Sequence, residues 1–179
     1  MINIETIITN VLALEGGFIN HPLDKGGPTN HGITLAAFNE FTGHKNNEHD
    51  IQILTQVQAR AIYRRNYYTT PHINQLPEEI QPLVFDMAVN HGPKTAIKLL
   101  QSQLLANGYF PGAIDGIIGP KTVTAATKAI GGSSHVLINN LVNRRIQLYQ
   151  SIIKKDKSQA AFAKGWIARS ETFRPVALA

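Results

Sequence analysis

The chain has 179 residues, 43% of them hydrophobic, and carries a formal net charge of +5. This length and composition suit one compact domain or two small ones, and they exclude global disorder and fibrous structure. The sequence contains no cysteine, which excludes disulfides, thiolate metal sites and cysteine nucleophiles. Its apolar runs are too short for a membrane span. The N-terminus has no basic segment, so we expect no cleaved secretory signal.

Charge is distributed unevenly along the chain. Residues 1–90 contain nine acidic and five basic side chains, whereas residues 91–179 contain three acidic side chains and twelve Lys or Arg. The basic half favours contact with an anionic envelope, either lipopolysaccharide or a membrane surface. Exposed helices commonly carry such lysines without a partner, so both interpretations stay open. The basic half lacks an aromatic-interleaved motif, which disfavours nucleic acid as a partner.

Apolar residues at helical spacing predict a first helix that begins after Asn3 and ends at the Gly16-Gly17 pair. Residues 18–33 are rich in turn formers and show no helical period. They predict a long ordered loop or a short β-like hairpin.

The rest of the chain also has the spacing and capping residues of helices. Their expected ranges are 34–41, 55–68, 82–92, 93–108, 120–130, 134–155 and 158–169, with a polar surface loop at 43–50 and a break at 131–133. Composition and charge change at the Gly92-Pro93 step, which we therefore take as the boundary between two domains, residues 1–92 and 93–179. The predicted fold class is mainly α.

Glu15 is the candidate for acid chemistry. It stands at the predicted C-terminus of the first helix, where the carbonyl dipoles disfavour a carboxylate. Leu12, Leu14 and Phe18 would add desolvation, and both effects raise the pKa of a carboxyl group. A carboxyl that keeps its proton near neutral pH is what a general acid requires. The simpler alternative is a surface glutamate at a frayed helix end, and this feature alone favours that alternative.

Asp24 and Thr29 follow Glu15 in one glycine-rich segment. A carboxylate and a hydroxyl can together hold a water molecule opposite an acid, and two carboxyl groups that flank one bond are the arrangement of glycoside hydrolysis. Asp24 can equally form an Asx-turn with the residues that follow it. The spacing alone leaves both interpretations open.

The segment EGGFINHPLDKGGPTNHGIT, residues 15–34, resembles the signature of glycoside hydrolase family 108, a lysozyme-like N-acetylmuramidase family. The likeness continues at VFDMAVNHGP, and the later segments LLQSQLL, DGIIGPKT, RRIQLYQ and FAKGWIARS are similar to the small peptidoglycan-binding domain that typically follows the muramidase part. The resemblance spans about residues 5–171. It implies a lysozyme-like helical domain with a short irregular or β-like active-site loop, followed by a small helical domain.

The resemblance also implies cleavage of the β-1,4 bond between N-acetylmuramic acid and N-acetylglucosamine in bacterial peptidoglycan, with no metal or cofactor. Glu15 would protonate the departing oxygen, and Asp24 would stabilise positive charge or orient the attacking water. Glu15 and Asp24 also keep the first spacing of phage T4-type lysozymes. In those enzymes a Thr follows the Asp at a set distance, and in this chain that distance falls on Asn30. The threonine here is Thr29, one residue earlier, so the third active-site residue is either Thr29 or Asn30.

Three further residues are expected to contact the sugar. His31 lies in the active-site segment and would shape the glycan cleft. Tyr67 offers a flat aromatic face with a hydroxyl group, as sugar subsites do. Asn90 shares a helix face with Asp86 and could bond an N-acetyl group, while Asp86 is favoured as a buried polar partner.

Other features are assigned to structure rather than to chemistry. The histidine spacings match no zinc pattern, so we expect no metal site. Phe162 and Trp166 are expected to pack the last helix.

The compact form, the absent signal and the muramidase-plus-binding arrangement most resemble an endolysin of a phage or prophage. Such an enzyme would be a monomer, made in the cytoplasm without a signal peptide, that reaches the periplasm and cell wall after holin-type release. A non-catalytic wall-binding or autolysin-regulating protein on a lysozyme-like scaffold is the alternative, although a binding module has no need of an acid such as Glu15. An amidase or peptidase is a third hypothesis.

Overall fold

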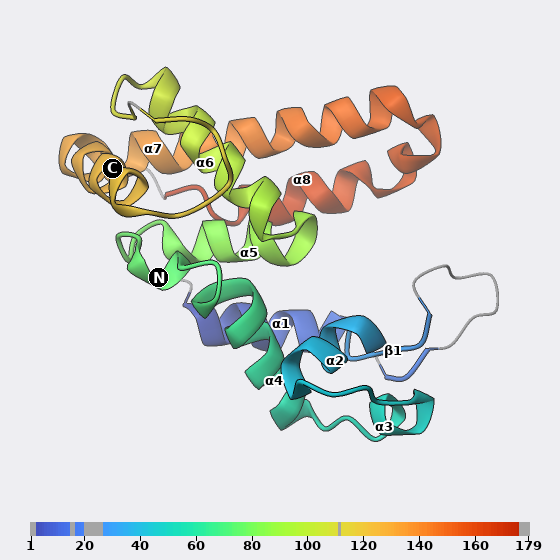
Figure 1. The fold of residues 1–179 in the computed structure, drawn as a ribbon. Coiled ribbons are helices and arrows are strands. Elements are labelled where there is room, and N and C mark those ends of the chain that lie inside the picture. Colours follow the sequence, from blue (N-terminus) through green and yellow to red (C-terminus); the bar gives the residue numbers. More distant parts are fainter. Residues whose placement is uncertain (1–2, 15–16, 20–26, 111, 176–179) are drawn as a thin grey trace. The chain divides into compact units, whose positions relative to one another are not determined.

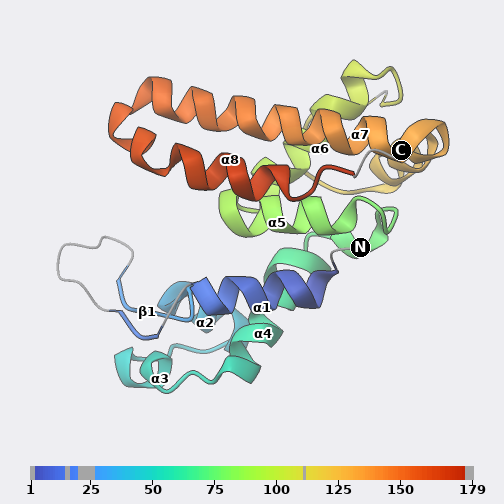
Figure 2. The same cartoon turned by 180° about the vertical axis from the view of Figure 1, so that it is seen from behind.

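A computed structural model describes residues 3–14, 17–19, 27–110 and 112–175 (Figures 1 and 2). These residues are mainly helical, with a single small two-stranded sheet among them, which confirms the predicted fold class. Within the described part of the chain, no helix is long and apolar enough to cross a membrane. The chain forms two compact units, Met1–Pro71 and His72–Ala179, each described below by itself.

The first unit packs short helices around a hairpin. Its elements are α1 (Ile4–Leu14), β1 (Thr29–Asn30), β2 (Ile33–Thr34), α2 (Leu35–Thr42), α3 (Glu48–Gln52), α4 (Gln56–Arg64) and the π-helical turn η1 (Arg65–Thr69). Helix α1 contacts α4. The core of the unit consists of buried apolar side chains, among them Ile7, Ile8, Val11, Leu12, Ile33, Phe38, Ile51, Leu54 and Ile62.

Side-chain caps fix where the helices of this unit begin. Thr34 caps α2, because its hydroxyl accepts a hydrogen bond from the Ala37 amide at 3.1 Å. Thr55 caps α4 and forms a capping box with Gln58. Both caps confirm the sequence prediction.

The prediction of a polar loop over residues 43–50 was wrong for residues 48–50, which are helical. Helix α3 begins at Glu48, because Asn47 accepts hydrogen bonds from two amides of the first turn and Asp50 closes a capping box. An asparagine followed three residues later by an acidic residue is a variant of the usual capping pattern, and the polar composition of the segment concealed it.

The second unit is a stack of longer helices. Its elements are the 3₁₀ turn η2 (Ile73–Gln75), α5 (Gln81–His91), α6 (Pro93–Ala106), α7 (Pro120–Lys155), the 3₁₀ turn η3 (Lys157–Phe162) and α8 (Ala163–Glu171). Helix α6 packs on both α5 and α7, and α8 runs back along α7 (Figures 1 and 2). Because α5 belongs to this compact unit, the units divide at a different place from the predicted domains 1–92 and 93–179, and that boundary stays a prediction.

Helix α7 contains the predicted break. Ser133 has extended backbone angles, φ −171° and ψ 112°, inside an otherwise continuous helix. The Val136 amide donates to the Ser133 hydroxyl at 3.4 Å, so Ser133 caps the second half of the helix, which was expected to begin at residue 134.

The turn-rich segment before α7 is organised by one buried glutamine. The Gln101 amide group donates to Asp115 Oδ1 at 2.8 Å and to the Ile117 carbonyl at 3.0 Å, and it accepts from the Gly116 amide at 2.8 Å. The bond from Gln101, followed by one from the Ile117 amide, holds the pKa of Asp115 below its ordinary value. The Asp-Gly-Ile-Ile-Gly-Pro sequence thus joins α6 to α7.

Candidate active site

The sheet of the first unit pairs two segments that are ten residues apart in the sequence. Ile19 and Thr29 exchange two backbone hydrogen bonds, of 2.8 and 2.9 Å, and β1 then pairs with β2. Asp24 lies in the sequence between these two paired residues, and Glu15 follows the last residue of α1. Glu15 and Asp24 both lie outside the described residues.

Thr29 and Asn30 face opposite sides of β1, because successive side chains of a strand alternate. Asn30 is buried, and its side-chain nitrogen donates to the carbonyls of Ile51 and Gln52 at 3.0 and 2.9 Å. Asn30 therefore fastens the hairpin to the end of α3. The side chain of Thr29 is half-buried on the other face.

His31 forms the hairpin turn together with Gly32. Both residues have positive φ values, 51° and 73°, as the two central positions of a type I′ turn require. The Tyr63 hydroxyl donates to the His31 carbonyl at 3.1 Å, which ties the turn to α4. The Nδ1 atom of His31 is buried and has no hydrogen-bond partner among the described residues.

Tyr67 lies next to Tyr63, with ring centroids 5.6 Å apart, in the π-helical turn that follows α4. Turns of this type often occur at functional sites. Burial, together with the negative charge of Glu40, raises the pKa of the Tyr67 hydroxyl. The hydroxyl therefore keeps its proton at neutral pH and can donate a hydrogen bond.

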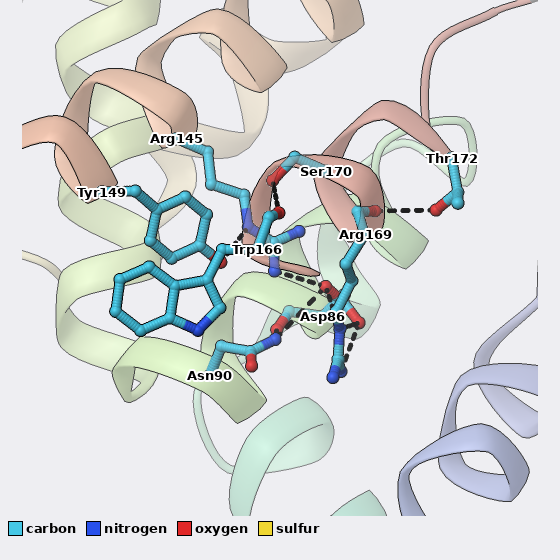
Figure 3. Close-up of polar contacts among 8 residues, drawn as sticks. All are labelled: Asp86, Asn90, Arg145, Tyr149, Trp166, Arg169, Ser170 and Thr172. Carbon is cyan, nitrogen blue, oxygen red and sulfur yellow. Dashed lines mark hydrogen bonds and ion pairs between the residues drawn. The ribbon is translucent and has the colours of Figure 1, made fainter. Parts of the chain in front are cut away.

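Asn90 lies in the second unit and is exposed, beside an ionic cluster whose members Asp86 and Arg145 are buried (Figure 3). Its side-chain nitrogen donates to the Asp86 carbonyl at 2.9 Å and approaches Asp86 Oδ2 at 3.4 Å. Asp86 is 3% exposed and forms ion pairs with Arg145 at 2.6 Å and with Arg169 at 2.8 Å. The carboxylate is buried, as expected, and it joins α5 to α7 and α8 through these two ion pairs.

Sequence reasoning did not single out Arg145, whose side chain is fully buried. Its neighbours at helical spacing are the buried residues Leu141, Val142 and Tyr149. A basic residue at a core position of an amphipathic helix needs a buried acid, and this pattern could have identified Asp86 as its partner.

His91, which follows Asn90, is next to the same cluster. Its pKa is lowered to about 4, first by burial and then by the charge of Arg145, while Asp86 opposes this effect and Arg169 adds to it. The imidazole is therefore neutral at neutral pH.

The hairpin thus brings together Thr29, Asn30 and His31, and Tyr63 connects them to Tyr67. In the described parts of the chain, no group of three or more His, Asp or Glu side chains is placed to hold a metal ion.

Comparisons with known proteins give two family matches. Residues 8–92 match the family described as Glycosyl hydrolase 108, and residues 95–171 match the family described as Predicted Peptidoglycan domain. Among solved structures, the chain is similar to SagA of Brucella abortus, with 32% sequence identity and a TM-score of 0.73. That match covers 95% of this chain and 90% of the other. No protein in the curated set matches.

Proposed function

Because the chain belongs to the glycosyl hydrolase 108 family, we propose that this peptidoglycan hydrolase cleaves the β-1,4 bond between N-acetylmuramic acid and N-acetylglucosamine. The observation that carries the proposal is the combination of a glycosyl hydrolase match with a peptidoglycan domain match in one chain. A glycosidase followed by a wall-directed domain acts on the glycan strand of the wall.

In this proposal Glu15 is the general acid, which protonates the glycosidic oxygen as the bond breaks. It follows α1 directly, and the buried stripe of that helix contains Val11 and Leu12. A carboxyl group beside helix carbonyls and apolar side chains has a raised pKa and so retains its proton. General acid catalysis of this kind accelerates bond cleavage about a hundredfold or more.

Asp24, with Thr29, is proposed to position water or to stabilise developing positive charge. Thr29 is preferred to Asn30 as the third active-site residue, because the amide nitrogen of Asn30 is already bonded to the carbonyls at the end of α3. Asn30 would then support the site by holding the hairpin, which places the Thr29 hydroxyl on the opposite face of β1.

His31, Tyr67 and Asn90 are the proposed sugar contacts. The protonated Tyr67 hydroxyl is a donor for a sugar oxygen, and the buried Nδ1 of His31 is a polar atom that still lacks a partner among the described residues. Asn90 keeps its side-chain oxygen as an acceptor for an N-acetyl N–H group, since only its nitrogen bonds Asp86.

The bond that breaks is identified by mass analysis of digested peptidoglycan, compared between wild type and the variant Glu15→Gln. We expect new reducing ends on N-acetylmuramic acid without new free amines, and a loss of about a hundredfold or more in Glu15→Gln. Wall binding and the melting temperature should be unchanged in the variant. New free amines would indicate an amidase or peptidase, and wild-type activity in the variant would exclude Glu15 as the acid.

We further propose an endolysin role, in which the enzyme acts on the wall after holin-type release and uses its basic second unit to approach the anionic envelope. Residues 72–179 contain twelve Lys or Arg and six acidic residues, and this excess attracts a polyanion. Expression in a Gram-negative host with and without a holin tests the role, because lysis is expected only when the holin is present.

A further inference from the structure

Three aromatic rings of the second unit form a stack that leads from the core to the surface. The rings of Tyr149 and Trp166 lie 4.8 Å apart at 20°, and those of Trp166 and Phe162 lie 5.8 Å apart at 25°. Tyr149 is 2% exposed, Trp166 is half-buried and Phe162 is 56% exposed. We call these three residues the aromatic ladder. The expected packing of the last helix is thus seen for Trp166, while the ring of Phe162 stays largely outside.

The inner end of the aromatic ladder is fixed by the ionic cluster (Figure 3). The Tyr149 hydroxyl accepts a hydrogen bond from Arg145 Nε at 3.0 Å, and its ring lies 5.0 Å from that of His91. Arg145 is in turn paired with Asp86. Because Arg145 and Asp86 are buried, the position of the Tyr149 ring is set before any ligand arrives.

The outer end of the ladder is left open by small neighbours. The residues on either side of Phe162 are the alanines Ala161 and Ala163, and a Cβ at the exposed Gly165, three residues on, would meet no atom within 4 Å. A single exposed phenylalanine is common on protein surfaces. One that stacks on a half-buried tryptophan and has alanines on both sides in the sequence presents a flat apolar face to solvent.

The chain around the ladder is strongly basic. Four exposed lysines lie between residues 154 and 164, namely Lys154, Lys155, Lys157 and Lys164. The acidic residue among them, Asp156, uses its carboxylate to accept hydrogen bonds from Ser158. A flat apolar face with lysines close to it in the sequence suits a ligand that has both an apolar face and carboxylates.

We propose that the aromatic ladder is a binding site for one sugar unit of the peptidoglycan strand. The pyranose stacks its C–H face on Phe162, and the carboxylates of the lactyl-linked stem peptide face Lys157 and Lys164. Sugar rings bind aromatic faces in this way because one side of the pyranose is apolar while its edge is polar. The inference rests on the proposed function for its ligand, the wall glycan, but it requires no catalysis.

The experiment uses the intrinsic fluorescence of the full chain, in which Trp166 is the sole tryptophan. Two probes are titrated: a disaccharide-tripeptide muropeptide, which has no bond of the type proposed to be cut, and the neutral sugar tri-N-acetylchitotriose. We expect a saturable change with both probes and tighter binding of the muropeptide. Phe162→Ala should weaken both affinities about three- to tenfold, and Phe162→Tyr should restore them.

Two further variants serve as controls. Val136→Ala removes an apolar side chain of similar exposure, 54%, outside the ladder, and should bind both probes like wild type. Lys164→Ala should weaken the muropeptide alone. Wild-type affinity of Phe162→Ala for both probes would overturn the inference, as would Phe162-dependent binding to phosphatidylglycerol vesicles without any glycan binding.

The readouts separate this inference from the proposed function. Ladder binding in a chain that releases no reducing ends from peptidoglycan would overturn the muramidase proposal and leave the ladder site intact. Normal hydrolysis together with unchanged binding in Phe162→Ala would overturn the ladder site and leave the muramidase proposal intact.

Discussion

Arg145 and Asp86 form an ion pair of 2.6 Å in the core of the second unit, where their side chains are 0% and 4% exposed. Arg169 approaches the same carboxylate from α8 at 2.8 Å. One acidic group thus compensates two cations that come from different helices. Breaking a buried pair of this kind is costly because it leaves an uncompensated charge away from water.

We therefore expect Asp86→Asn, which leaves the buried Arg145 without a carboxylate partner, to destabilise the second unit by about 3 kcal/mol or more, measured by urea unfolding. The matched control is Glu171→Gln, which breaks the exposed pair with Arg174 and should cost about 1 kcal/mol or less. Equal effects of the two substitutions would show that the burial of the Arg145 pair is not what matters.

The stability of the protein should fall as the pH drops from 6.5 toward about 4, because of His91. Its folded-state pKa is about 4 against an ordinary value of 6.5, so within this window the unfolded chain binds the additional proton. The stability that results from burying His91 in its neutral form is fully present above pH 6.5. It is lost progressively as the pH falls toward about 4. In His91→Gln, urea midpoints should decline less over the same range; an unchanged decline would assign the pH dependence to other groups.

Thr29 and Asn30 should give opposite results when each is substituted. Thr29→Val keeps the shape and strand preference of the side chain but removes the hydroxyl, so it should reduce peptidoglycan hydrolysis while the melting temperature is kept. Asn30→Ala leaves carbonyls of α3 without their donor and should cost about 2 kcal/mol in unfolding free energy. If Asn30→Ala keeps its stability but no longer hydrolyses peptidoglycan, Asn30 rather than Thr29 is the third active-site residue.

Gly116 should not tolerate a side chain. Its φ is +81°, and a Cβ there would lie 2.7 Å from the Lys94 side chain and 2.9 Å from the Lys94 carbonyl. Gly116→Ala should therefore destabilise the second unit by about 2 kcal/mol, from the left-handed conformation and the clash together. Gly119→Ala, in open space in the same motif, is the control and should melt near the wild-type temperature.

Attraction between the basic second unit and an anionic envelope should depend on salt. Binding to lipopolysaccharide is expected to weaken markedly from low to high ionic strength, because exposed charges are screened within about 10 Å at ~0.1 M salt. A sedimentation assay with increasing sodium chloride measures this effect. Unchanged binding over the titration would contradict an electrostatic contribution.

Local signals in the sequence predicted most of the helices. Thr34 and Thr55 identified two helix starts because a capping hydroxyl acts on amides only a few residues away. The break at Ser133 was visible for the same reason, as small residues interrupt a helical pattern. Each of these features depends on its immediate neighbours in the chain.

The contacts that sequence reasoning missed join residues far apart. Nothing near Asn30 in the sequence indicates that its amide bonds the end of α3, and the partners of Asp86 lie on other helices, where only the core position of Arg145 offered a signal. Such partners are chosen by the tertiary fold, which brings unsatisfied donors and charges together as water is excluded. The assignment of Glu15 as the acid likewise stays a prediction from helix position and family resemblance.

The backbone pairing of Ile19 with Thr29 has an evolutionary consequence. The hairpin turn, Asn30 and the start of α2 are anchored by their own bonds on the downstream side of this pair. Insertions, deletions or exchanges between the two paired residues change the length of one closed segment and add only a small entropic cost. Relatives that keep Asp24 can therefore vary the length and the other side chains of this short segment, while the paired strands on its downstream side are inherited unchanged.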